Sequence, residues 1–445
     1  MIKLRYFVAP LLATALAARP AWGDVPPAQE EEPQEAKPPE AVGAVPQVPA
    51  TDPATQPGGK AALKPHRNEL IIVPALGGNS DIGVQFGAAV SIAHFRPGYK
   101  PYRWRMDAVA AMSVKNDVRG FRAVQQYHGL RFDVPQAIWP WLRADVRLNY
   151  LRAIDYEWYG LGNRTGIDNR PPPEQAANAN QYLTENIRFR GLFRIQLGLP
   201  FELAIATNLR YEFPTIYPGT TLADDAAAGR IIGDKPGFLE TLGGGIFIDR
   251  RNNEFFPTKG YFYQFGVAQT IGTQQDIRFG EVSAFLMHYT ELFTPKVVFA
   301  TRMIGSLKFG NIPFYELQTG GVYDPLILVG GNRGIRGIPQ GRYGGPLKLV
   351  NNNELRVSPF PRFNVLAWSV KVGMLGYFDA GRVFADYAYD RARDGRRLGL
   401  KYSTGGGFFF QWDEATVFRV EAAYSPDTIG GRGIPSFYFE NGMLF

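Results

Sequence analysis

Residues 142–150 read LRADVRLNY, and this stretch indicates the fold class of the whole chain. Its apolar residues are Leu142, Ala144, Val146, Leu148 and Tyr150, and the residues between them are Arg143, Asp145, Arg147 and Asn149. Strict alternation of this kind indicates a β-strand with one apolar face and one polar face. The same alternation recurs in residues 187–197 and 418–424.

The alternating runs are long, many of them about 10–15 residues, whereas strands of soluble proteins average about 5–6. A tilted strand needs about 9–11 residues to cross a membrane. Aromatic residues stand at run ends, as at Trp139, Trp141, Tyr211 and Phe213, where interfacial girdles are expected. The sequence therefore predicts an all-β fold, a transmembrane antiparallel β-barrel of about 16 strands. The expected strands are 69–75, 82–95, 101–114, 119–134, 141–151, 184–198, 201–213, 238–250, 259–272, 277–292, 295–308, 347–358, 365–381, 400–412, 415–425 and 435–445.

The composition fits a barrel with an apolar outer surface and a polar lumen. Aromatic residues make up 14% of the 445 residues, yet the mean hydropathy is −0.18. The net charge is +7, but the arginines alternate with apolar residues in strands instead of clustering. This favours a cationic lumen, or attraction to anionic lipid headgroups, over a nucleic-acid partner. The absence of cysteine excludes disulfides, thiolate metal sites and cysteine nucleophiles.

The first 66 residues differ in composition from the rest and lack the alternating pattern. Lys3 and Arg5 precede an apolar stretch, and Ala21-Trp22-Gly23 is a small-x-small cleavage site, so residues 1–23 are expected to be a signal peptide cleaved near Gly23. Residues 24–66 are rich in Pro, Glu, Ala and Gln and predict a disordered periplasmic tether. Residues 67–445 then form the barrel.

Five motifs resemble those of one family of outer-membrane barrels. They are WYGLGN at 158–163, DRRNN at 249–253 followed by FPTKG at 256–260, GGNRGIRGI at 330–338, NELR at 353–356 and YFDAG at 377–381. In this order and spacing they resemble the BamA/TamA family, also called bacterial surface antigens, over residues 67–445. The resemblance implies transport, protein insertion or assembly, or lipid handling at the outer membrane. It also implies a long loop, residues 309–346, that folds into the lumen.

The resemblance predicts a charged lock between this loop and the barrel wall. It places Arg336 and Gly337 in the family's loop motif, Glu354 on the following strand, and Tyr377, Asp379 and Gly381 on the next. Alternation turns Glu354, Tyr377 and Asp379 towards the lumen, where both carboxylates could accept one guanidinium. The alternative is that Arg336 is a solvated loop charge. Ile338 departs from the family's Phe, so a weaker aromatic shelf is expected.

The sequences near the two ends of the chain lead to predictions about domain content, the C-terminal signal and barrel closure. Residues 24–66 are too short and too polar for a POTRA domain, so the chain resembles a stand-alone barrel. The final residues, with Phe437, Phe439 and a last Phe445, resemble the C-terminal signal read by the barrel assembly machinery, although they could be only a final strand. Closure is expected between 69–75 and 435–445, and Pro74 and Gly442 predict a weak seam there. Alternatively, Pro74 merely bends a strand end.

Candidate catalytic residues are not found in the sequence. There is no Gly-x-Ser-x-Gly motif, and His66, His94, His128 and His288 have no zinc-binding spacing. Ser283 and His288 share a run but are expected on opposite faces. No enzyme activity, metal or cofactor is therefore predicted, and a passive porin and an outer-membrane lipase are the alternatives. The expected partners are outer-membrane lipids, lipopolysaccharide and the assembly machinery; the cargo stays open.

Overall fold

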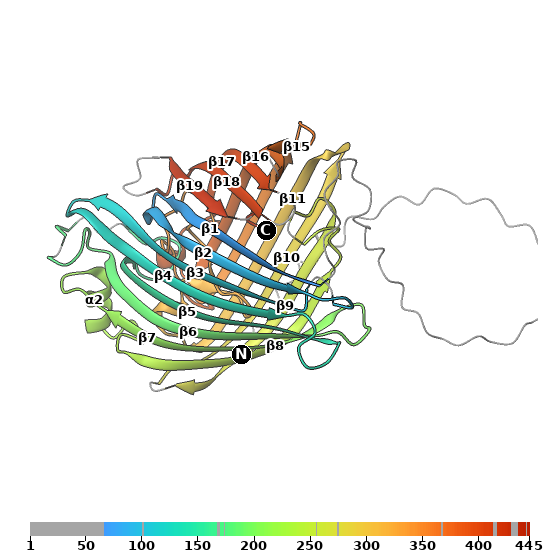
Figure 1. Ribbon diagram of the computed structural model, residues 1–445. Helices are drawn as coiled ribbons and strands as arrows, with labels where there is room; N and C mark the ends of the chain where they lie inside the picture. Colours follow the sequence, from blue (N-terminus) through green and yellow to red (C-terminus); the bar gives the residue numbers. More distant parts are fainter. Residues whose placement is uncertain are drawn as a thin grey trace, which may run out of the picture. The chain divides into compact units, whose positions relative to one another are not determined.

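The computed structural model describes residues 66–445, apart from 100–101, 167–169, 173, 255, 274–275, 366–367, 413–415, 429–434 and 442. Sixteen long strands of this part close into one antiparallel barrel, which confirms the predicted fold (Figure 1). They are β1 (Arg67–Asn79), β2 (Gly83–Phe95), β3 (Trp104–Asp117), β4 (Gly120–Val134), β5 (Leu142–Glu157), β6 (Gln181–Ile195), β7 (Glu202–Thr215), β8 (Gly237–Asp249), β9 (Gly260–Thr273), β10 (Arg278–Leu292), β11 (Thr294–Asn311), β14 (Leu347–Val357), β16 (Trp368–Phe384), β17 (Lys401–Trp412), β18 (Thr416–Tyr424) and β19 (Ser436–Asn441). The short β15 (Phe363–Val365) pairs with the start of β16.

Each strand pairs with its neighbour in the sequence, so the connections alternate between the two ends of the barrel. We call the end that carries the start of β1 and the end of β19 the terminal end, and the opposite one the loop end. Connections at the terminal end are short, for example Phe293 alone between β10 and β11. The loop end carries the longest ones, including the segment with α2 (Thr221–Ala227) and the segment with α3 (Arg391–Asp394). Among the described residues, no helix is long and apolar enough to span a membrane.

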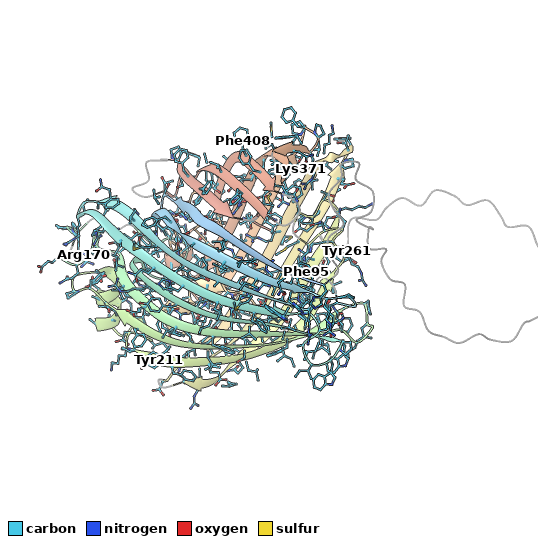
Figure 2. The ribbon with its side chains drawn as sticks, viewed as in Figure 1. Phe95, Arg170, Tyr211, Tyr261, Lys371 and Phe408 are labelled. Carbon is cyan, nitrogen blue, oxygen red and sulfur yellow. The ribbon has the colours of Figure 1, made fainter. Side chains whose placement is uncertain are left out.

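Side chains alternate between an exposed outer face and a covered inner face. On β17, Phe408 is 55% exposed and points away from the interior, whereas the next residue, Phe409, is fully buried (Figure 2). On β10, Ser283 is buried in the lumen and His288 lies on the exposed outer face, as predicted. An apolar outer surface can face lipid, and the polar groups of the inner face are left to pair with one another.

The segment between β11 and β14 fills much of the lumen, as expected for an inserted loop. It contains η2 (Phe314–Glu316), β12 (Thr319–Gly320) and β13 (Leu326–Ile327), and most of its residues are buried. One part packs with Trp158 and Tyr182, and another packs with Phe285 and Val350 of the wall. We call residues 312–346 the inserted loop.

Several expected boundaries are wrong. The first strand runs over Arg67–Asn79 instead of 69–75, because the pair Gly77-Gly78, which reads as a turn, stays in the ladder opposite Gln85 and Val84. The last strand is Ser436–Asn441 instead of 435–445, because the chain leaves the sheet and Leu444 and Phe445 contact the lumenal Arg302. The strand expected at 365–381 is β16, Trp368–Phe384. The signal peptide and the tether up to residue 65 lie outside the described residues.

Candidate functional site

The tip of the inserted loop turns sharply at Arg336 and Gly337. Gly337 has a φ of +83°, a backbone conformation that side-chain-bearing residues rarely adopt. A Cβ atom at Gly337 would also lie 3.1 Å from the Cβ atom of Ala423 on the wall. Glycine therefore lets the loop backbone approach β18 closely, which brings the Arg336 side chain against the wall.

The guanidinium of Arg336 lies among three carboxylates. Its Nε and Nη2 atoms donate to the two oxygens of Asp379 at 2.8 and 3.0 Å, which is a bidentate pair. Its Nη1 atom donates to Glu354 at 2.7 Å and to Glu421 at 3.3 Å. The side chains of all four residues are fully buried. The Tyr377 ring covers the guanidinium, with its centre 3.4 Å from the Arg336 Cζ atom.

Two further arginines balance the charge of this cluster. Arg356 donates to Glu354 at 2.9 Å, and Arg419 donates to Glu421 at 2.9 Å. With Arg336 and Asp379, the cluster holds three guanidinium groups and three carboxylates. Such a buried set is stable only when each charge has a partner, and the removal of one member leaves an uncompensated charge. We call these six residues the charge cluster.

The structure brings all six predicted lock residues together. Glu354 and Asp379 lie on the adjacent strands β14 and β16, in the diagonal relation given by Asn352 opposite Asp379 and Glu354 opposite Tyr377. A Cβ atom at Gly381 would lie 2.7 Å from the Cδ1 atom of Ile335, so this glycine makes room for the loop next to Arg336.

Sequence reasoning missed Glu421 and Tyr438. Glu421 contributes the third carboxylate from β18, and the Tyr438 hydroxyl on β19 accepts the backbone N–H of Gly337 at 2.7 Å. Alternation around Glu421 turns its side chain inwards, but the sequence does not tell that β18 lies close to the tip of the inserted loop. Ile338, the departure from the family's Phe, is fully buried among apolar side chains.

The predicted seam residues are arranged differently from the expectation. Pro74 lies opposite Ala88 of β2, and the described part of β19 pairs with β1 at two positions, Gly78 opposite Phe439 and Asn79 opposite Tyr438. The expected pairing of 69–75 with 435–445 is therefore wrong, because β19 is short and meets only the loop end of β1. Phe437 is exposed, and Gly442 lies outside the described residues.

Phe445 also departs from its expected place on the last strand. Its ring centre lies 5.1 Å from the Cζ atom of Arg302 and 5.2 Å from that of Arg356. Its backbone oxygen accepts a hydrogen bond from Arg356 at 2.8 Å. Arginine and aromatic faces attract each other, so these lumenal arginines draw the residue away from the sheet.

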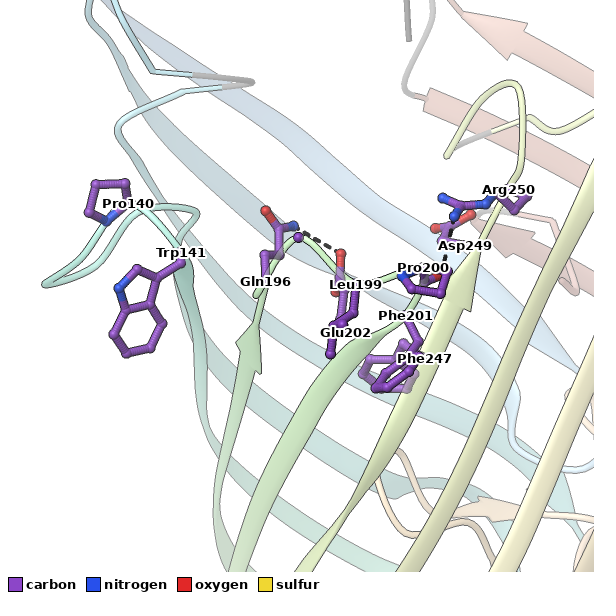
Figure 3. Close-up of a pocket in the computed structure, with 11 residues that line it drawn as sticks. Pro140, Trp141, Gln196, Leu199, Pro200, Phe201, Glu202, Phe247, Asp249 and Arg250 are labelled. Atoms are coloured by element: carbon purple, nitrogen blue, oxygen red, sulfur yellow. Dashed lines mark hydrogen bonds between the residues drawn. The ribbon is translucent and has the colours of Figure 1, made fainter. Parts of the chain in front are cut away.

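A pocket of about 410 Å³ opens at the terminal end of the barrel (Figure 3). Trp141, Glu202, Phe247 and Arg250 are among its lining residues, and Gln196 donates to Glu202 at 2.9 Å. None of the predicted lock residues lines it. Among the described residues there is no group of three or more His, Cys, Asp or Glu side chains placed to hold a metal ion.

A family profile agrees with this architecture. The Omp85 superfamily domain matches residues 124–445, which is well over half of the chain. The chain belongs to the Omp85 superfamily. No curated protein matches it. As a member of the Omp85 superfamily, it is an outer-membrane β-barrel protein.

Solved structures of BamA and CdiB share its fold. BamA from Haemophilus ducreyi lacking POTRA domains 1–3 matches with a TM-score of 0.54 and 14% identity, over 84% of this chain and 70% of that one. CdiB from Escherichia coli matches with a TM-score of 0.53 and 12% identity, over 84% of this chain and 62% of that one. CdiB from Acinetobacter baumannii matches with a TM-score of 0.51 and 10% identity, over 86% of this chain and 60% of that one.

Proposed function

We propose that this barrel inserts or exports polypeptides at the outer membrane by admitting an extended strand between β1 and β19. The observation that carries the proposal is the short seam. Of the thirteen residues of β1, only Gly78 and Asn79 pair with the described part of β19. Just beyond them, the Ser80 amide donates to the Phe437 carbonyl at 3.2 Å.

The rest of the β1 edge supplies backbone N–H and C=O groups that can bind an extended polypeptide strand. Its peptide groups between Arg67 and Gly77 pair with β2 on one side, and on the other side they have no ladder partner in the described part of β19. Unpaired backbone groups are costly in lipid and bind another extended strand by main-chain hydrogen bonds. Such recognition is largely independent of sequence, which suits an insertion or export activity with varied cargo.

The inserted loop supports this function over that of a passive porin. The charge cluster fixes the loop inside the lumen, where its buried apolar residues pack against the barrel wall and obstruct the lumen. A porin would give a large and steady single-channel conductance. We expect a small, fluctuating conductance from the purified protein in planar bilayers.

The location and the biogenesis of the chain follow from its N-terminal segment. Residues 1–23 direct export and are removed near Gly23, residues 24–66 tether the barrel in the periplasm, and the assembly machinery inserts it among phospholipid and lipopolysaccharide. Mass spectrometry of the mature N-terminus tests the cleavage position.

A cross-link across the seam tests the proposed function. The chain lacks cysteine, so Ser80→Cys combined with Phe437→Cys can be oxidised in native membranes without background. Val84→Cys combined with Val114→Cys, across the continuous β2–β3 ladder, is the matched control. In cells depleted of the native protein, we expect the seam cross-link to lower the outer-membrane protein content, and reduction to restore it.

The control pair should have no effect. Full function in a completely cross-linked seam variant would contradict the proposal. If depletion lowers only the lipid content of the outer membrane, the barrel handles lipid instead of protein.

A further inference from the structure

A second polar site lies in the lumen, away from the charge cluster. A cavity of about 180 Å³ separates the inner face of β4–β7 from the inserted loop. Tyr127 and Asn149 line it from the wall, and Tyr315 and Gln318 line it from the loop. A water molecule occupies about 30 Å³ in the liquid, so the cavity can hold several waters or one polyatomic ion with waters around it.

The lining of this cavity is strongly cationic. Arg188, Arg190 and Arg210 contribute guanidinium groups to it, and no carboxylate lines it. Two of the three are neutralised from outside the lining: Arg190 pairs with Asp324, and Arg210 pairs with Glu212 and Glu316.

Arg188 is the exception. It forms no ion pair and no side-chain hydrogen bond with any residue in the described part of the chain, and its Nε atom is enclosed without a partner. It is only partly covered, and its side chain lines the cavity.

The strand register adds repulsion between arginines of the barrel wall. Arg188 lies directly opposite Arg210 across β6 and β7, and Arg190 lies directly opposite Arg147 across β5 and β6. Like charges directly opposite in a sheet destabilise it. An anion in the cavity would offset this repulsion, and it would give Arg188 an ion-pair partner at salt-bridge distance, which no described residue supplies although Glu316 and Glu212 attract it from farther away.

We propose that the cavity binds a small tetrahedral oxyanion of the phosphate class, with Arg188 as its principal ligand. The planar guanidinium presents paired N–H donors that match two oxygens of such an ion. Asn186, which is 95% buried and also lines the cavity, adds a side-chain amide. The site lies in the lumen between the wall and the inserted loop, so it suits a free oxyanion better than a headgroup attached to acyl chains in the bilayer.

Thermal unfolding of the purified full-length chain in detergent tests the site. Inorganic phosphate replaces chloride at constant ionic strength, and the unfolding midpoint is read from the heat-modified band. A ligand that binds only the folded state raises stability with the logarithm of its concentration. We expect the native midpoint to rise in this way, and we expect Arg188→Gln to abolish the rise.

Two variants separate the site from general effects of charge. Arg396→Gln removes one positive charge from an exposed loop and should keep the native response to phosphate. Arg188→Lys keeps the charge but loses the paired donors, so its affinity should fall roughly tenfold, as expected for one charge-assisted hydrogen bond. In buffer without phosphate, Arg188→Gln should be at least as stable as the native chain, because it removes an unpaired, partly buried cation.

Direct binding of radiolabelled phosphate to the native protein provides a second measurement, which does not depend on the variant's folding. The proposal is overturned if phosphate leaves the native midpoint unchanged, or if Arg188→Gln keeps the native response. Glycerol phosphate distinguishes the source of the ion: binding of this ester without binding of inorganic phosphate would indicate a lipid headgroup and contradict a free oxyanion.

Discussion

The Arg336 guanidinium of the inserted loop stacks on the Tyr377 ring of the barrel wall at 3.4 Å, and the same guanidinium pairs with carboxylates from three strands. The loop and the wall therefore share one buried, charge-balanced contact. Disturbing this contact should change both the stability of the barrel and the obstruction of its lumen.

Arg336→Ala should destabilise the barrel and release the loop. The change leaves Glu354, Asp379 and Glu421 with one cation too few, and breaking a buried ion pair costs about 3–5 kcal/mol. The heat-modification midpoint should fall, and the conductance in planar bilayers should rise. Arg333→Ala, on the same loop with a half-exposed side chain, is the control. Unchanged stability and conductance in Arg336→Ala would show that the lock has no structural role.

Tyr438→Phe should weaken the barrel near the seam. The hydroxyl of Tyr438 accepts the buried N–H of Gly337, and its loss leaves that donor unsatisfied at a cost of about 1–3 kcal/mol. Because Tyr438 is also opposite Asn79, cross-linking between Ser80→Cys and Phe437→Cys should become slower in this background. Tyr424→Phe, at an exposed position on β18, should change neither quantity. Equal cross-linking rates in both backgrounds would rule out coupling between the lock and the seam.

Gly381→Ala should be much more harmful than Gly376→Ala, although both lie on β16. A Cβ atom at Gly381 would lie 2.7 Å from both the Ile335 side chain and the backbone oxygen of Leu349, whereas one at Gly376 meets no atom within 4 Å. Overpacking of this kind costs about 1–3 kcal/mol. The unfolding midpoints of the two variants provide the comparison, and similar midpoints would mean that the loop tip adapts freely.

Deletion of residues 26–64 should leave the barrel intact. This segment has no pattern that could form a core, and β1 begins at Arg67. The shortened chain should still show heat modifiability and resist protease in detergent. Rapid digestion of the shortened barrel, under conditions in which the full-length one survives, would show that the segment contributes to folding.

The barrel should lose stability as the pH rises from about 4 to about 7. Burial and the nearby Glu157 raise the pKa of Asp81, in the β1–β2 turn, from 3.8 to about 7, and Lys115 opposes them only in part. In this window the folded state binds more protons than the unfolded state, so its stability falls with rising pH. Asp81→Asn should remove that part of the dependence and raise the midpoint at pH values above 7. Asp276→Asn, at an exposed position, should keep the native profile. Parallel profiles for all three proteins would exclude Asp81 as the titrating group.

The strands of the barrel wall could be predicted better than the contacts of the inserted loop in the lumen. In runs such as 142–150, the alternation of apolar and polar residues shows which face of the strand each side chain occupies. The number of strands, their inner and outer faces and the adjacency of Glu354 and Asp379 could therefore be predicted from the sequence. Alternation does not tell which strands lie across the lumen from a loop. For that reason Glu421 and Tyr438, from β18 and β19, were missed.

Strand ends were also poorly predicted. Gly77 and Gly78 look like a turn but continue β1, because their ladder partners on β2 come from tertiary pairing. Phe445 continues the alternation of the last strand, yet Arg302 and Arg356 hold it in the lumen. Contacts distant in sequence decide both cases.

The position of the seam bonds has a mechanical consequence. All of the described β1–β19 bonds lie at the loop end of β1, so a force that parts the two strands from the terminal end acts on one bond at a time. The ladder between β10 and β11 is paired along its whole length, so the same force would have to break many more bonds to part those two strands. The seam is therefore the boundary that peels first under lateral tension in the bilayer, while the other ladders keep the barrel's circumference together.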